Sequence, residues 1–130
     1  METATTDMGS GFDDLIGLKL LEFGPDGGEA QLLIDPRHHQ LHGIVHGGVY
    51  TTIVETVASI SGIAWLASRG GGSCVGVNNS TDFLRGISEG LVTATSTPIH
   101  RGRSQQLWVV EISDETGRMV ARGQVRLHNT

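Results

Sequence analysis

Residues 45–69 read VHGGVYTTIVETVASISGIAWLASR, and this pattern predicts one long, enclosed helix. The helix is expected to begin near Gly47 and to end near Arg69, where the glycine run 70–72 supplies a left-handed stop. Apolar residues recur at three- and four-residue steps, and others widen this surface: Val49, Ile53, Val54, Val57, Ile60, Ile63, Ala64 and Leu66. A helix with so wide an apolar surface needs the rest of the chain to cover it.

One acidic residue interrupts this apolar helix. Glu55 is the only charged side chain between Gly47 and Ser68, and burying an unpaired carboxylate is costly. Thr51, Glu55 and Ser59 are spaced four residues apart, so they share one narrow polar stripe on the helix. We interpret the stripe as a surface that meets water or a ligand.

Strand patterns flank the helix on both sides. We expect a short helical turn at Phe12–Ile16 and six strands, at Leu18–Phe23, Glu29–Ile34, Ser73–Phe83, Leu91–His100, Ser104–Ser113 and Arg118–Leu127. The turn sequence at residues 24–28 predicts a hairpin between the first two strands, and the last three strands form an antiparallel meander. The prediction is an α+β fold in which a curved antiparallel sheet wraps round one helix. It forms one domain over residues 12–130, after a flexible segment at residues 1–11.

Composition limits the classes of function. The 130 residues carry a formal net charge of −5, which argues against general binding to nucleic acid or to an anionic membrane. Cys74 is the single cysteine, so no intrachain disulfide can form and a cytoplasmic location is expected. Residues 1–10 do not resemble a secretory signal, and Glu55 with its neighbouring hydroxyls argues against a membrane span. A long buried helix in so small a domain favours a homo-oligomer.

Gln40, the tetrapeptide Val45-His46-Gly47-Gly48, Glu55 and Ser59 together resemble the hotdog-fold acyl-CoA thioesterases. The similarity extends over nearly the whole chain from about Phe12. It is closest to the branch, including phenylacetic-acid-pathway enzymes, that acts on aromatic and other acyl-CoAs such as 4-hydroxybenzoyl-CoA and 1,4-dihydroxy-2-naphthoyl-CoA. A related branch has Asn in place of Gln40 and Asp in place of Glu55.

The resemblance implies a hydrolase without a cofactor, assembled as a homotetramer that is a dimer of dimers. Each active site would lie at a dimer interface, with Glu55 from one subunit and Gln40, His46 and Gly47 from the other. An aromatic acyl-CoA is the expected substrate.

The chemistry of thioester cleavage fits these residues. A thioester carbonyl becomes an oxyanion when attacked, and the free N–H groups at the start of a helix can stabilise it. We assign the Gly47 N–H as the main donor, while Gln40 or His46 donates a second hydrogen bond or positions water. Glu55 acts either as general base or as a nucleophile that forms a mixed anhydride. Ser59 is expected to assist Glu55 or the water, or simply to bond a backbone carbonyl.

Similar enzymes bind CoA through regions that correspond here to two parts of the chain. One is the basic turn with His100, Arg101 and Arg103. The other comprises Arg85 on a neighbouring connection and the polar strand residues Asn78, Asn79 and Ser80. The opposing interpretation is that these arginines are solvated turn residues.

The sequence leaves two alternative functions open and excludes a third. A noncatalytic acyl-CoA sensor would not require an acid at position 55, and a hotdog dehydratase or hydratase would move a proton at carbon. Serine-dependent thioesterases are excluded because the sequence has no Gly-x-Ser-x-Gly motif.

A histidine-rich loop precedes the helix and raises the question of a metal. His42 and His46 have four-residue spacing, but Gly43 interrupts the helix that would align them. We therefore expect no metal site, and we expect His38 and His39 to lie at the surface of the loop.

Overall fold

The computed structural model describes residues 11–130, so the predicted flexible segment lies almost wholly outside the described residues. In chain order the elements are α1 (Phe12–Ile16), β1 (Lys19–Gly24), β2 (Gly27–Ile34), a 3-10 turn (Pro36–His38), α2 (Gly47–Ala67), β3 (Cys74–Phe83), β4 (Gly90–Arg101), β5 (Gln105–Ser113) and β6 (Met119–Asn129). Each predicted helix and strand is present, and each boundary differs from the prediction by only a few residues.

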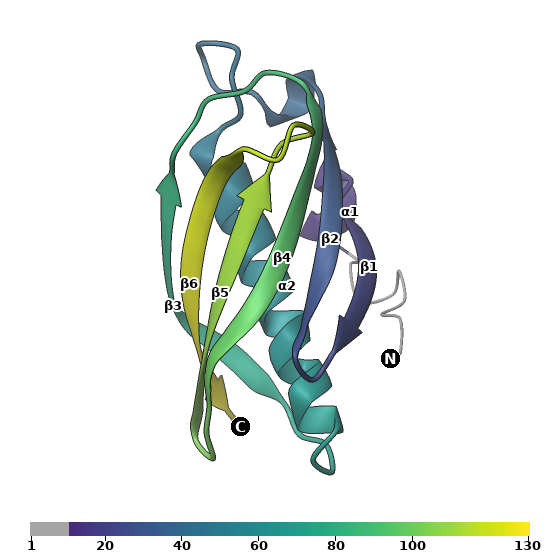
Figure 1. The fold of residues 1–130 in the computed structure, drawn as a ribbon, viewed down its shortest axis with the longest axis vertical. Helices are drawn as coiled ribbons and strands as arrows, with labels where there is room; N and C mark the ends of the chain where they lie inside the picture. The colour runs from purple at the N-terminus through teal and green to yellow at the C-terminus, as the bar shows by residue number, and fades with distance from the viewer. Residues whose placement is uncertain (1–10) are drawn as a thin grey trace.

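The six strands form one antiparallel sheet in the order β1-β2-β4-β5-β6-β3, which curves round α2 (Figure 1). The predicted hairpin is β1–β2, and the predicted meander is β4–β5–β6. After α2 the chain returns along β3, which pairs only with β6 and so forms one edge of the sheet. The predicted α+β architecture is therefore confirmed.

The core lies between α2 and the concave face of the sheet. Ile53, Val54 and Val57 of α2 are fully buried there, as is Trp108 of β5. β6 comes so close to the helix that a Cβ on Gly123 would collide with Val54. Residue alternation along β6 places Val125 inside and its neighbours outside, as a half-buried strand requires.

Within residues 11–130, α2 is the one helix long and apolar enough to cross a membrane. The sheet curves round it and buries its apolar side chains, including Ile53 and Ile60. We therefore assign α2 as the core helix of a soluble domain, in agreement with the expectation that it does not span a membrane.

Two neighbouring leucines of β2 test the register of the sheet. Leu32 is 1% exposed and Leu33 is 64% exposed. Leu32→Ala should lower the free energy of unfolding by about 2–5 kcal/mol, because it leaves a cavity in the core. Leu33→Ala should change it by less than about 0.5 kcal/mol. Urea denaturation of both variants checks this, and equal losses would show that the register is wrong.

Candidate active site

The start of α2 presents a free backbone donor. His46 is the N-cap residue, and its Nδ1 accepts a hydrogen bond of 2.7 Å from the Gly48 N–H. The His46 carbonyl accepts from the Val49 N–H at 2.9 Å. The Gly47 N–H has no hydrogen-bond partner within residues 11–130. It lies at the positive end of the helix dipole, where a developing oxyanion is stabilised.

A cavity of about 270 Å³ adjoins Gly47. The lining residues include Gln40, Gly47, Tyr50, Phe83 and Arg85, so the structure brings three predicted site residues together. A Cβ on Gly47 would collide with the ring of Phe83, which explains why glycine is needed here. The Gln40 side-chain oxygen accepts from the His42 N–H, and its amide NH2 group has no partner within the described chain.

Two aromatic residues that the sequence analysis did not select line this cavity. The ring centroids of Tyr50 and Phe83 are 6.2 Å apart, with the planes tilted by 39°. Tyr50 is 2% exposed, and its hydroxyl has no partner among the residues described. Burial, and to a smaller extent the charge of Asp114, raises the pKa of Tyr50 to about 12. The sequence offered one indication that Tyr50 lies near the site: it is three residues after Gly47, one helical turn away.

Glu55 is half-buried on α2 and is held against the edge strand β3. Its Oε1 accepts a hydrogen bond of 3.1 Å from Asn79 Nδ2, which also donates to the Thr51 carbonyl at 3.1 Å. Asn79 Oδ1 in turn accepts from Thr81 Oγ1 at 2.7 Å. A Cβ on Gly76 would collide with Glu55 Oε2, so the carboxylate lies directly over the strand backbone. Asn79, predicted to contact substrate, is thus also in position to orient the acid.

Ser59 is half-buried one helical turn after Glu55. Its backbone carbonyl lies 4.0 Å from the Cys74 thiol, while its hydroxyl has no hydrogen-bond partner in the described part of the chain. The hydroxyl is therefore free to bond a water near the carboxylate. The alternative in which it bonds a backbone carbonyl is not what the structure shows.

Glu55 and Gly47 do not meet within one subunit. Eight residues separate them along α2, which corresponds to a rise of roughly 12 Å. That distance is too long for both groups to act on one carbonyl. Gln40, His46 and Gly47 thus form one part of the site, and Glu55 with Asn79 and Ser59 forms another.

The predicted CoA-binding residues fall into separate groups. Arg85 lines the cavity beside Gly47, and Asn78 and Ser80 are exposed on β3. His100, Arg101 and Arg103 lie at the β4–β5 turn, at the other end of the sheet.

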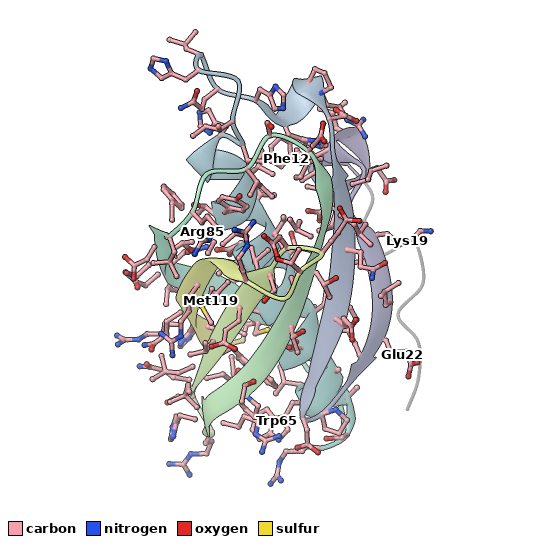
Figure 2. The ribbon with its side chains drawn as sticks, turned by 45° about the horizontal axis from the view of Figure 1, so that its top comes forward. Phe12, Lys19, Glu22, Trp65, Arg85 and Met119 are labelled. Atoms are coloured by element: carbon pink, nitrogen blue, oxygen red, sulfur yellow. The ribbon has the colours of Figure 1, made fainter. Side chains whose placement is uncertain are left out.

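A second cavity, of about 400 Å³, lies at that turn and is lined by Trp65, Arg69, Arg101 and Arg103 among others. Figure 2 shows Trp65 well separated from Arg85. Arg101 donates to the Pro25 carbonyl at 2.6 Å and pairs with Asp26 at 2.8 Å. Asn129 donates to the backbone carbonyls of residues 102 and 103, at 3.0 Å and 3.1 Å, and so fixes the turn.

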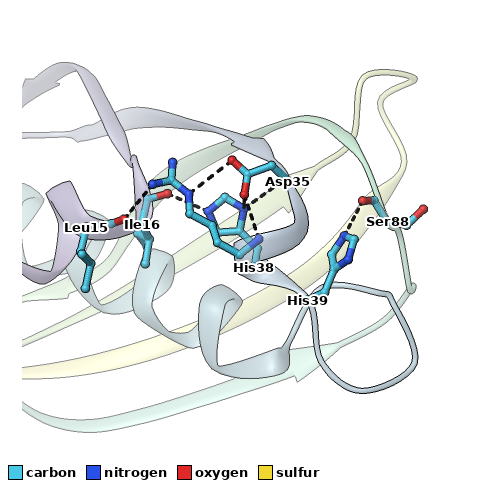
Figure 3. Close-up of polar contacts among 7 residues, drawn as sticks. Leu15, Ile16, Asp35, His38, His39 and Ser88 are labelled. Carbon is cyan, nitrogen blue, oxygen red and sulfur yellow. Dashed lines mark hydrogen bonds and ion pairs between the residues drawn. The ribbon is translucent and has the colours of Figure 1, made fainter.

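The histidine loop differs from the prediction at one position. His38 is fully buried rather than at the surface, because both of its ring nitrogens bond backbone groups (Figure 3). His39 is half-buried, and its Nε2 bonds the Ser88 carbonyl at 2.8 Å. No group of three or more potential metal ligands occurs within residues 11–130.

The fold and these groups are those of a hotdog-fold thioesterase. The Thioesterase superfamily model matches residues 42–121, and the chain belongs to this family. Proofreading thioesterase EntH of Cronobacter sakazakii is 37% identical over 103 residues, which cover 79% of this chain and 74% of EntH.

Two solved structures are similar over nearly their whole length. Rv1847 from Mycobacterium tuberculosis has a TM-score of 0.89 at 58% identity, covering 92% of this chain and 95% of that one. Thioesterase HI1161 from Haemophilus influenzae has a TM-score of 0.89 at 30% identity, covering 99% of this chain and 92% of that one. The predicted family, hotdog fold and thioester hydrolase class are confirmed.

The Asn79 contact gives a test of how Glu55 is oriented. Asn79→Ala should lower kcat for thioester hydrolysis by about tenfold, because the carboxylate loses its one side-chain donor and its fixed position. Gln124→Ala is the matched control, since this side-chain amide on the neighbouring strand β6 is exposed and bonds neither Glu55 nor α2 within residues 11–130. Steady-state kinetics of both variants measure the effect. Equal kcat values for the two variants would contradict the role given to Asn79.

Proposed function

We propose that this protein hydrolyses acyl-CoA thioesters, with an aromatic acyl group as the preferred substrate, to the free acid and CoA. The observation that carries the proposal is the pairing of two features on α2. One is the free N–H of Gly47 beside a cavity, and the other is a carboxylate, Glu55, held by Asn79 at the edge of the sheet. The similarity to a protein named a proofreading thioesterase supports the same reaction type.

A dimer formed through β3 would complete the site. β3 is an edge strand with unpaired backbone groups, and Val75, Val77, Phe83 and Leu84 leave apolar surface exposed on or next to it. A two-fold axis beside β3 pairs the strand with its copy and sets the two α2 helices antiparallel. Glu55 of one subunit then faces the α2 start of the other. A tetramer of two such dimers follows from the family resemblance.

In this arrangement the thioester carbonyl oxygen accepts from the Gly47 N–H of one subunit, with the Gln40 amide as the second donor. Glu55 of the other subunit removes a proton from water, which attacks the carbonyl carbon while the C–S bond breaks and the thiolate of CoA leaves. Alternatively, Glu55 attacks first and water cleaves the mixed anhydride. His46 keeps the helix start in place through its bond to Gly48, and Ser59 bonds the attacking water. Neither route requires a metal or a cofactor.

The cavity beside Gly47 suits an aromatic acyl group. Tyr50 and Phe83 present ring surfaces to a space of about 270 Å³. A cavity of roughly 150 Å³ in another protein is large enough for benzene, so an aryl ring fits in this volume.

The charged end of CoA is assigned to the predicted arginines. Arg85 lies beside the acyl cavity of one subunit. In an antiparallel pair the β4–β5 turn of the partner, with His100, Arg101 and Arg103, approaches the same end of the dimer. Asn78 and Ser80 are exposed on the edge strand between these groups.

A cytoplasmic location is proposed for the protein, and the buried, unpaired Cys74 is consistent with it.

Substituting Glu55 tests the reaction directly. Glu55→Gln keeps the shape and the Asn79 contact but removes the carboxylate, so kcat should fall by about 10²–10⁴-fold. The assay measures free-thiol release from a panel of aromatic and aliphatic acyl-CoAs, and aryl substrates should give the higher kcat/KM. Turnover of Glu55→Gln at the native rate would exclude this mechanism. Binding without cleavage by the native protein would favour the sensor, and water addition to an enoyl-CoA would favour the hydratase.

Mixed dimers test whether one site uses two subunits. Gly47→Pro removes the N–H at the first helical position, where proline is tolerated, and should lower kcat by about 10²–10³-fold. Gly47→Ala introduces the same Cβ beside Phe83 but keeps the N–H, so it serves as the control. Co-expressed Glu55→Gln and Gly47→Pro subunits should regain about a quarter of native activity, because half the dimers then contain one intact site. No recovery would mean that each subunit carries its own complete site.

A further inference from the structure

His38 is a fully buried polar residue that the proposed mechanism does not use. Its Nδ1 accepts from the Asp35 N–H at 2.9 Å, and its Nε2 contacts the Ile16 carbonyl at 2.7 Å. An amide N–H only donates and a carbonyl only accepts, so the neutral ring with its proton on Nε2 satisfies both contacts. Figure 3 shows the imidazole between α1 and the 3-10 turn.

His38 is also linked to the start of α2, through a hydrogen bond of its backbone carbonyl. The His38 carbonyl accepts from the His46 N–H at 2.8 Å, and His46 is the N-cap of α2. The bond between Nδ1 and Asp35 closes a reciprocal capping box, because the Asp35 side chain accepts from the Arg37 N–H at 3.0 Å. The conformation of the 3-10 turn therefore sets where the His38 carbonyl lies, and this carbonyl sets where His46 lies.

The loop between residues 39 and 45 has bonds of its own and an exposed tip. The Gln40 N–H donates to the Ile44 carbonyl at 2.8 Å, and Leu41, at the tip, is 101% exposed. Two bonds anchor the chain just before Gly47: the Val45 N–H donates to the Ile87 carbonyl at 2.9 Å, and the His46 N–H donates to the His38 carbonyl. The turn at His38 supplies the second of these acceptors.

We propose that His38 is a positioning residue for thioester hydrolysis: its Nδ1 closes the 3-10 turn, and the His38 carbonyl, bonded to the His46 N–H, then fixes His46 so that the Gly47 N–H on the next peptide points at the developing oxyanion. The inference rests on the oxyanion role proposed for Gly47. Stabilisation by such a donor depends on its placement within a fraction of an ångström. His38 touches no substrate and acts through His46.

Two substitutions of His38 test separately its contact with the Asp35 N–H in the turn and its contact with the Ile16 carbonyl. His38→Asn keeps an acceptor near the Asp35 N–H and loses the donor to Ile16, whereas His38→Gln keeps a donor that reaches Ile16 and loses the acceptor. His38→Gln should lower kcat by about 10-fold or more with KM within about twofold, because only transition-state stabilisation is lost. His38→Asn should stay within about twofold of native kcat.

Arg37→Ala is the matched control. Arg37 also holds α1, through a bond of 2.9 Å to the Leu15 carbonyl, and its Nε pairs with the Asp35 carboxylate at 3.3 Å. Its side chain leaves the bond between the Asp35 N–H and His38 in place and makes no hydrogen bond to the start of α2 within the described residues. The kcat of Arg37→Ala should equal the native value. The Gly47 amide resonance of 15N-labelled protein gives a readout that does not need activity. It should shift in His38→Gln and stay in place in His38→Asn and Arg37→Ala, while thermal unfolding shows whether each variant folds.

Three results would overturn the inference: native kcat in His38→Gln, an equal loss in Arg37→Ala, or an unmoved Gly47 resonance in His38→Gln. A loss in His38→Asn as large as in His38→Gln would also overturn it, because the turn acceptor would then have no effect. Absence of thioester hydrolysis by the native protein is a different outcome. It would refute the proposed function, and the amide resonance would still decide whether His38 positions Gly47.

Discussion

Enclosure of α2 by the sheet is the constraint on which the rest of the structure depends. A helix of 21 residues with a wide apolar surface is stable in water only if that surface is covered. The six strands of one sheet curve round it, with β3 at one edge of the sheet. Glu55 lies where this cover ends. The carboxylate escapes full burial there, yet it stays close enough to β3 for Asn79 to hold it. Stability of the core and placement of the acid thus have one origin.

The same enclosure separates the two groups to which the proposed mechanism assigns hydrolysis, Gly47 and Glu55. In a helix, backbone N–H groups without an intrahelical partner occur only in the first turn. A half-buried carboxylate that β3 can hold must instead lie near the middle of α2. Gly47 and Glu55 satisfy these requirements two turns apart. In the proposed dimer, the open edge beside Glu55 of one copy meets the aromatic cavity beside Gly47 of the other. This explains why so small a domain is proposed to work as an assembly.

Much of the fold could be predicted from the sequence because periodicity reports directly on burial. The helix expected from near Gly47 to near Arg69, the glycines after it and the alternating strands each carried a local signal, and all appear at the expected places. Contacts between distant segments carried no such signal. Asn79 looked like any polar strand residue, and only the pairing of β3 with β6 turns it toward Glu55. His38 seemed to be a surface residue because the acceptor for its Nε2, the Ile16 carbonyl, lies 22 residues earlier. Tyr50 carried no signal of its own, because a tyrosine within an apolar helix looks like one more core residue.

The buried hydroxyl of Tyr50 shows a compromise within the core. An unsatisfied hydroxyl costs about 1–3 kcal/mol of folding free energy, and phenylalanine would fill nearly the same volume without that cost. Tyr50→Phe is therefore a substitution that the packing of the core accepts. A substitution aimed at a higher melting temperature would begin at Tyr50, three residues from Gly47. A gain in stability at this position would also change the lining of the cavity beside Gly47.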